Sequence, residues 1–174
     1  MKRTVDAFDY AGHICKAMKK GILLTTGAGE QLNTMTIGWG HIGILWNRPT
    51  FIVYVRDSRH TSTMLDNHGE FTVNVPVGPI DGTILGVCGT KSGRDTDKIK
   101  DLNLTLEAPE TISVPGIKEL PLTLECKVLY KQDQGPENMD LEIQKRSYPP
   151  FFPDGRSDYH TVYYGQILNA YIIR

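Results

Sequence analysis

Short segments in which every second side chain is apolar recur along this chain, and they constrain its fold more than any other feature. The clearest is LTLECKVLY at 122–130, where the alternate positions from Leu122 to Tyr130 are apolar or aromatic. A period of two places these side chains on one face of a β-strand. Comparable segments predict further strands at 21–26, 33–38, 50–56, 70–75 and 161–173.

Glycines and hydroxyl-bearing residues mark where these segments turn or end. The turn TGAGEQ at 26–31 predicts a hairpin between the first two strands, and Gly165 predicts a bulge in the last one. The segment at 50–56 is apolar almost throughout, so we expect it to be buried on both faces. Helices are expected to be few and short, at 6–20, 61–67, 81–87 and 95–102. This organisation favours a mostly antiparallel barrel with a few small helices over a regular βαβ alternation.

The overall charge excludes several classes of function. Lys and Arg number 19 against 20 Asp and Glu, so the net charge is −1, and we expect no nucleic-acid partner. The longest apolar run, at 51–55, is far too short to cross a bilayer, so we expect no membrane partner. Three widely spaced cysteines and an N-terminal stretch without an apolar core indicate reduced thiols and a cytoplasmic location.

Two patterns imitate known motifs without their context. GWGHIG at 38–43 matches a dinucleotide-binding fingerprint, but Pro49 would stop the helix that must follow it. Asp95-x-Asp97 lacks the later glycine and glutamate of a calcium loop, and the five histidines lack metal-ligand spacing. The sequence therefore predicts neither a Rossmann fold nor a metal site.

Two polar loops have the composition of an anion site. Each places cations and hydroxyls just before an expected helix, whose first N–H groups lack intrahelical partners and favour phosphate. Alone, each loop is equally compatible with hydroxyls that cap a helix and cations that face water. Together they suggest one anionic ligand. The candidate contacts are Arg56, Ser58, Arg59 and Thr61 from VRDSRHT, and Lys91, Ser92 and Gly93 from CGTKSGRDTDK, which also contains Arg94 and Lys98.

A third stretch, NTMTIGWG at 33–40, combines a strand pattern with a glycine on each side of Trp39. Glycines let a flat ligand approach the backbone closely, where N–H and C=O groups can pair with a heteroaromatic edge. An ordinary strand with Trp39 in the core is the alternative.

NTMTIGWG, then Arg48-Pro49, FIVYVRDSRHT, EFTVNVP and SGRDTDK, taken in this order, resemble the flavin-reductase-like family of FMN-binding split β-barrels, which is related to flavoredoxin. The resemblance runs from about Met18 to Lys98, with weaker similarity at 124–131 and 160–167. It implies that residues 1–174 form a single domain with a Greek-key split β-barrel. It also implies a homodimer with FMN at the barrel edge, near the subunit interface.

By position, the resemblance implies that 33–39 borders the isoalloxazine, partly through backbone groups, and that the two polar loops surround the phosphate. The ring contacts would be Asn33, Thr34, Met35, Thr36, Ile37, Gly38 and Trp39. The implied activity is that of a flavin reductase, which passes hydride from NADH or NADPH to FMN. The open alternatives are a flavoredoxin-like FMN electron carrier with a redox partner protein, and a flavin-binding module without turnover. His160 is a candidate catalytic residue over the ring, against a purely structural role, and 148–160 is expected to be a flap, a dimer contact or a surface loop.

Overall fold

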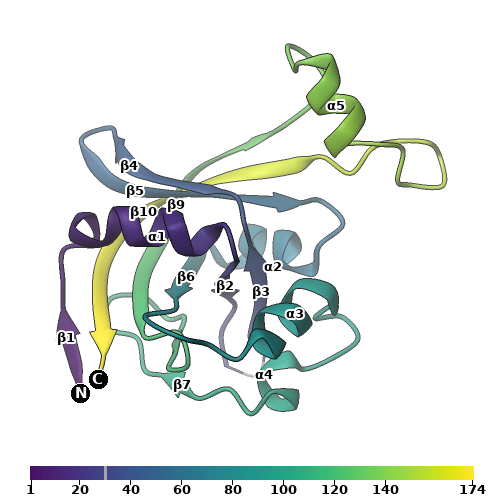
Figure 1. Ribbon diagram of the computed structural model, residues 1–174. Helices are drawn as coiled ribbons and strands as arrows, with labels where there is room; N and C mark the ends of the chain where they lie inside the picture. Colours follow the sequence, from purple (N-terminus) through teal and green to yellow (C-terminus); the bar gives the residue numbers. More distant parts are fainter. Residues whose placement is uncertain (30) are drawn as a thin grey trace.

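The computed structural model describes residues 1–29 and 31–174, and its dominant feature is a large antiparallel sheet (Figure 1). The strand order is β3-β2-β6-β9-β10-β5-β4, and β1 pairs with β10 beside this path. The strands are β1 (Lys2–Thr4), β2 (Ile22–Thr26), β3 (Asn33–Ile37), β4 (Gly40–Leu45), β5 (Arg48–Arg56), β6 (Glu70–Val75), β9 (Leu122–Asp133) and β10 (His160–Ile173). The predicted mainly β architecture is therefore confirmed.

The remaining elements are short and lie around this sheet. A second, two-stranded sheet pairs β7 (Leu106–Glu107) with β8 (Gly116–Ile117). No helix in the described part of the chain is long and apolar enough to span a membrane. These elements are the 3₁₀ helix η1 (Ala7–Tyr10), the helices α1 (Ala11–Met18), α2 (His60–His68), α3 (Gly82–Thr90), α4 (Lys98–Asp101) and α5 (Leu141–Ser147), and the strands β7 (Leu106–Glu107) and β8 (Gly116–Ile117).

Several predicted details are confirmed by the register of the strands. β2 and β3 form the predicted antiparallel hairpin, with Ile22 opposite Ile37; Glu30, in the predicted turn between them, lies outside the described residues. The pairing of β10 with β9 shifts at Gly165, where a bulge was expected. A Cβ on Gly165 would lie 2.4 Å from the Cζ atom of Phe71, so the bulge brings backbone against a core aromatic ring that leaves no room for a side chain.

Other expectations are wrong in instructive ways. β5 is not buried on both faces: Phe51 and Val53 are buried, but Tyr54, on the opposite face, is partly exposed and makes edge contacts with the rings of His41 and His160. The expected helix at 6–20 is a 3₁₀ turn followed by α1, which ends at Met18, and the helix expected at 95–102 is only α4. Strand β4 begins at Gly40, within GWGHIG, and runs to Leu45, which excludes the helix that a dinucleotide fold needs there.

Two apolar clusters hold the sheet between its covering elements. The larger lies on the side that α1 covers, and includes Ile14, Phe51, Phe71 and Tyr163. The smaller lies on the other side of β2, where Leu23 packs with side chains from α3 and the segment that follows α4. Helix α3 is thereby held against β3, and this contact brings the loop after α3 close to that strand.

The two ends of the strand order, β3 and β4, are neighbours in the chain. Only Gly38 and Trp39 separate them, so the sheet must curl enough to bring its ends close together. Hydrogen-bonded pairing of β3 with β4 is not found among the described strands. A closed Greek-key barrel therefore stays a prediction.

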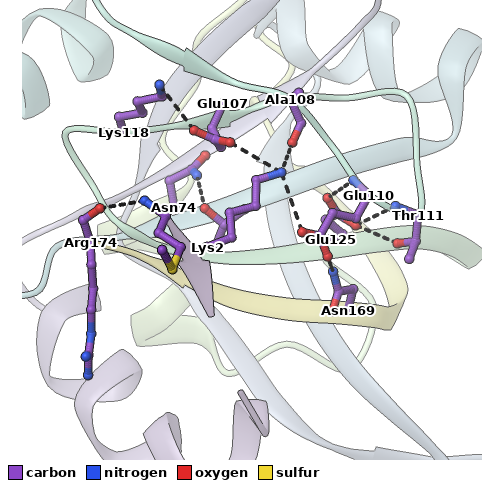
Figure 2. Close-up of polar contacts among 12 residues, drawn as sticks. Lys2, Asn74, Glu107, Ala108, Glu110, Thr111, Lys118, Glu125, Asn169 and Arg174 are labelled. Carbon is purple, nitrogen blue, oxygen red and sulfur yellow. Dashed lines mark hydrogen bonds and ion pairs between the residues drawn. The ribbon is translucent and has the colours of Figure 1, made fainter. Parts of the chain in front are cut away.

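Figure 2 shows how a polar cluster fastens the segment around β7 to the large sheet. The buried carboxylate of Glu125, on β9, accepts hydrogen bonds from the backbone N–H groups of Glu110 and Thr111 at 2.7 and 2.8 Å. The amine of Lys2, on β1, forms ion pairs with Glu107 and Glu110 at 3.4 and 3.6 Å. The charged groups of Lys2, Glu107 and Glu125 each have partners in the fold, so this cluster has a structural role.

Candidate functional site

Two adjoining cavities lie along one side of β3. The larger, of about 760 Å³, is enclosed by the start of α2, the loop at 91–95 and residues 146–158. The smaller, of about 180 Å³, is bordered by 35–39 on β3 and its continuation and by His160. Met35, Arg56 and Arg59 line both cavities, so the two adjoin. The larger volume is in the range typical of small-molecule and cofactor sites.

The structure brings the two polar loops together on β3. The Arg94 guanidinium donates to the backbone carbonyl of Ser58 at 2.9 Å, which ties the second loop to the first. The Asn33 amide donates to the Thr61 hydroxyl at 2.8 Å, which ties β3 to the first turn of α2. A Cβ on Gly93 would lie 2.3 Å from Oδ1 of Asn33, so this position accepts only glycine without a shift of its neighbours.

The larger cavity is strongly cationic although the chain carries a net charge of −1. Among the described residues, six cationic side chains line it against two carboxylates, those of Asp95 and Asp158. The pKa of His60 is lowered by burial and by the nearby charges of Arg94 and Lys98, which is what a positive potential in the cavity produces. The cations are Arg56, Arg59, Lys91, Arg94, Lys98 and Arg146.

The first turn of α2 presents free backbone donors to this cavity. Arg59 occupies the N-cap position with an extended backbone and makes no side-chain cap. Among residues 1–29 and 31–174, no acceptor is bonded to the backbone N–H of His60 or Thr61. The sequence left open that a hydroxyl of one of the polar loops caps this helix. The hydroxyls of Ser58 and Thr61 do not cap it, because that of Thr61 accepts from Asn33 and that of Ser58 donates to Asp158. The arrangement is a helix N-terminus open to an anion.

Arg56 and Ser58 already have partners in the 147–158 segment. The Arg56 guanidinium donates to the carbonyls of Asp158 and Ser147 at 2.6 and 2.9 Å. The N–H and hydroxyl of Ser58 donate to the Asp158 carboxylate at 3.0 and 2.6 Å. These two residues hold the segment over the cavity, and their contact with a ligand phosphate stays a prediction. Asp158 has no sequence signal, because its partner lies 100 residues away.

The side chains of β3 divide between the site and the sheet interior. Asn33 and Met35 line the larger cavity. The Thr34 hydroxyl is buried and accepts a hydrogen bond from Thr25 at 3.0 Å, and the Thr36 hydroxyl donates to the carbonyl of Leu85 at 2.7 Å. Contact of the two threonines with a ring would therefore involve backbone groups or the Thr36 methyl group, not their hydroxyls.

At the end of β3 the chain leaves the core. Ile37 is buried, whereas Gly38 is exposed and Trp39 is 50% exposed at the border of the smaller cavity. The alternative of Trp39 as a core residue is thus excluded. The Trp39 ring lies 5.0 Å from the His160 ring, measured between centroids, and an exposed aromatic beside a cavity is available to contact a ligand.

His160 is held by two partners that the sequence does not reveal. Its Nδ1 atom lies 2.8 Å from the Tyr148 hydroxyl, which donates to Oε1 of Gln134 at 3.0 Å. Burial and, secondarily, the Arg56 charge lower the pKa of His160 to about 4, so the ring is neutral at pH 7. Since the Tyr148 proton is engaged, Nδ1 carries the imidazole proton and Nε2 is left as an acceptor. The ring can accept a hydrogen bond at the smaller cavity but carries no positive charge there.

The sequence profile of the family described as "Flavin reductase like domain" matches residues 16–174, and the chain belongs to this family. An uncharacterized protein of Archaeoglobus fulgidus is 31% identical over 137 residues, which cover 78% of this chain and 76% of that protein.

Solved structures with the same fold include two flavoredoxins. That of Methanosarcina acetivorans is 26% identical with a TM-score of 0.63, and the match covers 88% of this chain and 68% of that one. That of Desulfovibrio vulgaris (Miyazaki F) is 20% identical with a TM-score of 0.64, covering 88% and 69%. Component B of the nitrilotriacetate monooxygenase of Bacillus cereus is 17% identical with a TM-score of 0.66, covering 99% and 79%.

Proposed function

We propose that this protein is an FMN-binding oxidoreductase, and specifically an NAD(P)H-dependent flavin reductase. The observation that carries the proposal is the convergence of the α2 N-terminus and the 91–95 loop on β3, which creates a cationic cavity that adjoins a smaller one beside Trp39. A flavin mononucleotide has the matching shape, with a charged phosphate at one end and a flat ring at the other.

The residues present fit this group. Free N–H groups of α2, the Arg59 guanidinium and the Lys91 amine supply the donors that a phosphate monoester requires. The absence of a side chain at Gly93 leaves the 91–95 loop in contact with Asn33 and the cavity open. The exposed backbone at Gly38 and the half-exposed Trp39 suit the approach of a flat ring.

FMN would supply the redox chemistry, accepting hydride from NADH or NADPH. The chain would supply binding, orientation and electrostatics. Arg59 lines both cavities, so its charge would lie between phosphate and ring. Neutral His160 would offer an acceptor to the ring edge without charge, as a positioning residue, and no side-chain acid or base is required for hydride transfer itself.

Cofactor binding is tested by comparing ligands that differ only in the phosphate. Arg59→Ala should weaken FMN binding about 10- to 100-fold, the value of a lost charge-assisted contact, and leave riboflavin binding nearly unchanged. Arg3→Ala, which removes an exposed arginine on β1, is the matched control and should affect neither ligand. If Arg59→Ala weakens the binding of FMN and riboflavin equally, Arg59 supports the fold and does not bind the phosphate. Failure of the wild-type protein to bind FMN would refute the proposal.

Anaerobic mixing of the FMN-loaded protein with NADH and with NADPH tests the reductase assignment. We expect the flavin absorbance to bleach at about 1 s⁻¹ or faster with one of them, within the usual range of enzyme turnover. If the flavin stays oxidised for minutes with both nucleotides, yet is reduced by dithionite, the protein is an electron carrier and not a reductase.

The carrier is the second candidate, and the similarity to the flavoredoxins of M. acetivorans and D. vulgaris favours it. In that case electrons would come from a redox partner protein. The two candidates use the same cofactor site, and only the donor distinguishes them.

We also propose that the protein acts as a homodimer in the cytoplasm. Exposed apolar side chains on the β4–β5 hairpin and the neighbouring strands support self-association: Ile44 is 63%, Trp46 56% and Tyr130 45% exposed. The three free cysteines, Cys15, Cys88 and Cys126, are consistent with a reducing compartment. Analytical ultracentrifugation should give a dimer at micromolar concentration, and Ile44→Glu should shift it toward monomer; a wild-type monomer with FMN bound would contradict the dimer.

A further inference from the structure

Lys98 differs from the other cations of the larger cavity in being buried. It is 4% exposed, whereas Arg59, Lys91, Arg94 and Arg146 are exposed. An exposed cation keeps its hydration without a ligand, but a buried ammonium has lost most of it. The cost of holding this charge must therefore be offset by a partner.

The described residues provide few hydrogen-bond acceptors and no counter-charge for the Lys98 amine. Among the described residues, the Lys98 amine donates one hydrogen bond, to the carbonyl of Lys91 at 3.2 Å, and these residues supply no acceptor for its other two protons. Its amine forms no ion pair with a carboxylate of residues 1–29 and 31–174. The pKa of Lys98 is lowered, mainly by burial; Cys88 acts in the opposite direction, and the charge of Arg59 adds to the lowering.

The position of Lys98 nevertheless keeps it at the cavity wall. It is the first residue of α4, whose N-cap Asp97 accepts from the backbone N–H of Lys100, so that carboxylate is turned to its own helix. The next residue, Ile99, packs against the smaller apolar cluster and fixes the register of this short helix. The Lys98 side chain is thus directed to the cavity, beside Cys88 and the 91–95 loop.

We propose that Lys98 is the residue that makes this site selective for a phosphorylated ligand, and that it does so at the expense of the stability of the ligand-free protein. A phosphate in the larger cavity supplies the counter-charge and acceptors that the fold withholds. This inference rests on the proposed function, and it adds that ligand affinity and ligand-free stability change in opposite directions at this one position.

Lys98→Met tests the proposal, because methionine fills similar space without charge. The ligand-free variant should have a Tm equal to or above that of wild type, since a buried, poorly paired charge has been removed. Its FMN affinity should fall about 10- to 100-fold, and its riboflavin affinity should change less than about twofold. Lys100→Met, an exposed lysine of the same helix that does not line the cavity, is the matched control and should change none of these quantities.

Inorganic phosphate provides a measurement that does not depend on flavin. It should raise the Tm of wild type above that in chloride of equal ionic strength, and this increase should be lost in Lys98→Met but kept in Lys100→Met. A Lys98→Met protein that is less stable or unfolded, or that keeps the wild-type ratio of FMN to riboflavin affinity, would overturn the proposal. If wild type responds to phosphate but binds neither flavin, the proposed function fails while the role of Lys98 stands.

Discussion

The buried, neutral His160 makes a specific contribution to the pH dependence of stability. In the folded protein its pKa is lowered to about 4 from an ordinary value of 6.5, because burial and the Arg56 charge oppose protonation. In the unfolded chain the ring is hydrated and takes its ordinary pKa. Between these two values the unfolded state binds more protons than the folded state, so acid favours unfolding.

The sign and size of the effect follow from this difference. Stability linked to His160 is fully present above the unfolded pKa and is lost as the pH falls from about 6.5 toward 4. Between pH 7 and pH 5 the full shift would remove about 2 kcal/mol from the free energy of unfolding, and residual hydration of the ring reduces this to about 1–2 kcal/mol.

The measurement is urea unfolding of wild type and His160→Gln at pH 7, 6 and 5. Glutamine does not titrate and can still donate to the Tyr148 hydroxyl, so the difference in free energy of unfolding between the proteins isolates the histidine from carboxylates that also titrate. We expect this difference to change by about 1–2 kcal/mol in favour of the variant as the pH falls from 7 to 5. Parallel curves over that range would show that His160 is not held neutral by the fold, and would refute the reasoning.

Three further substitutions probe the site and its support. Gly93→Ala places a Cβ 2.3 Å from Oδ1 of Asn33, so it should weaken FMN binding at least about 10-fold in calorimetric titration by displacing a buried hydrogen-bonded amide; unchanged affinity would move the FMN site elsewhere. Gly165→Ala, whose Cβ would lie 2.4 Å from Phe71, should lower the free energy of unfolding in urea by about 1–3 kcal/mol through overpacking, and an unchanged value would mean that the bulge adapts freely. Asp158→Asn removes one of two carboxylates from the cationic cavity and should raise the ratio of FMN to riboflavin affinity about 2- to 10-fold, as measured by fluorescence quenching; a lower ratio would show that the charge of Asp158 is needed to shape the site.

The parts of the fold that could be predicted from sequence are those set by local pattern. The segment at 70–75 alternates and coincides with β6, and the hydroxyl-rich start and Gly69 at the end bracket α2 closely. β4 was missed because glycines at 40 and 43 weaken a strand signal. α5 has no buried residue, so no apolar periodicity marks it.

The features of the site also divide into those that local sequence predicts and those that it does not. Composition alone indicated that the two polar loops would hold an anion, and the structure places them against one cavity. The contacts that assemble this cavity cross long separations, such as Arg56 with the carbonyl of Asp158, and no local pattern encodes them. The burial of Lys98 was equally invisible, because a lysine in a polar loop has the same signal whether it faces water or a cavity.

The strand order has a consequence for how the chain acquires its structure during synthesis. β3, β2 and β6 form one part of the large sheet and β5 with β4 another. Among the described strands, hydrogen bonding joins these two parts through β9 and β10, from the last third of the chain. A ribosome releases residues in order, so the first 75 or so emerge as two separate strand groups; the partner of β6 lies about 50 residues further on, and that of β5 about 110. Closing such distant pairings is slow. The larger cavity, whose wall includes 146–158, would be among the last features to form. If it is the FMN site, as proposed, FMN would be captured only by a chain whose synthesis has reached β10.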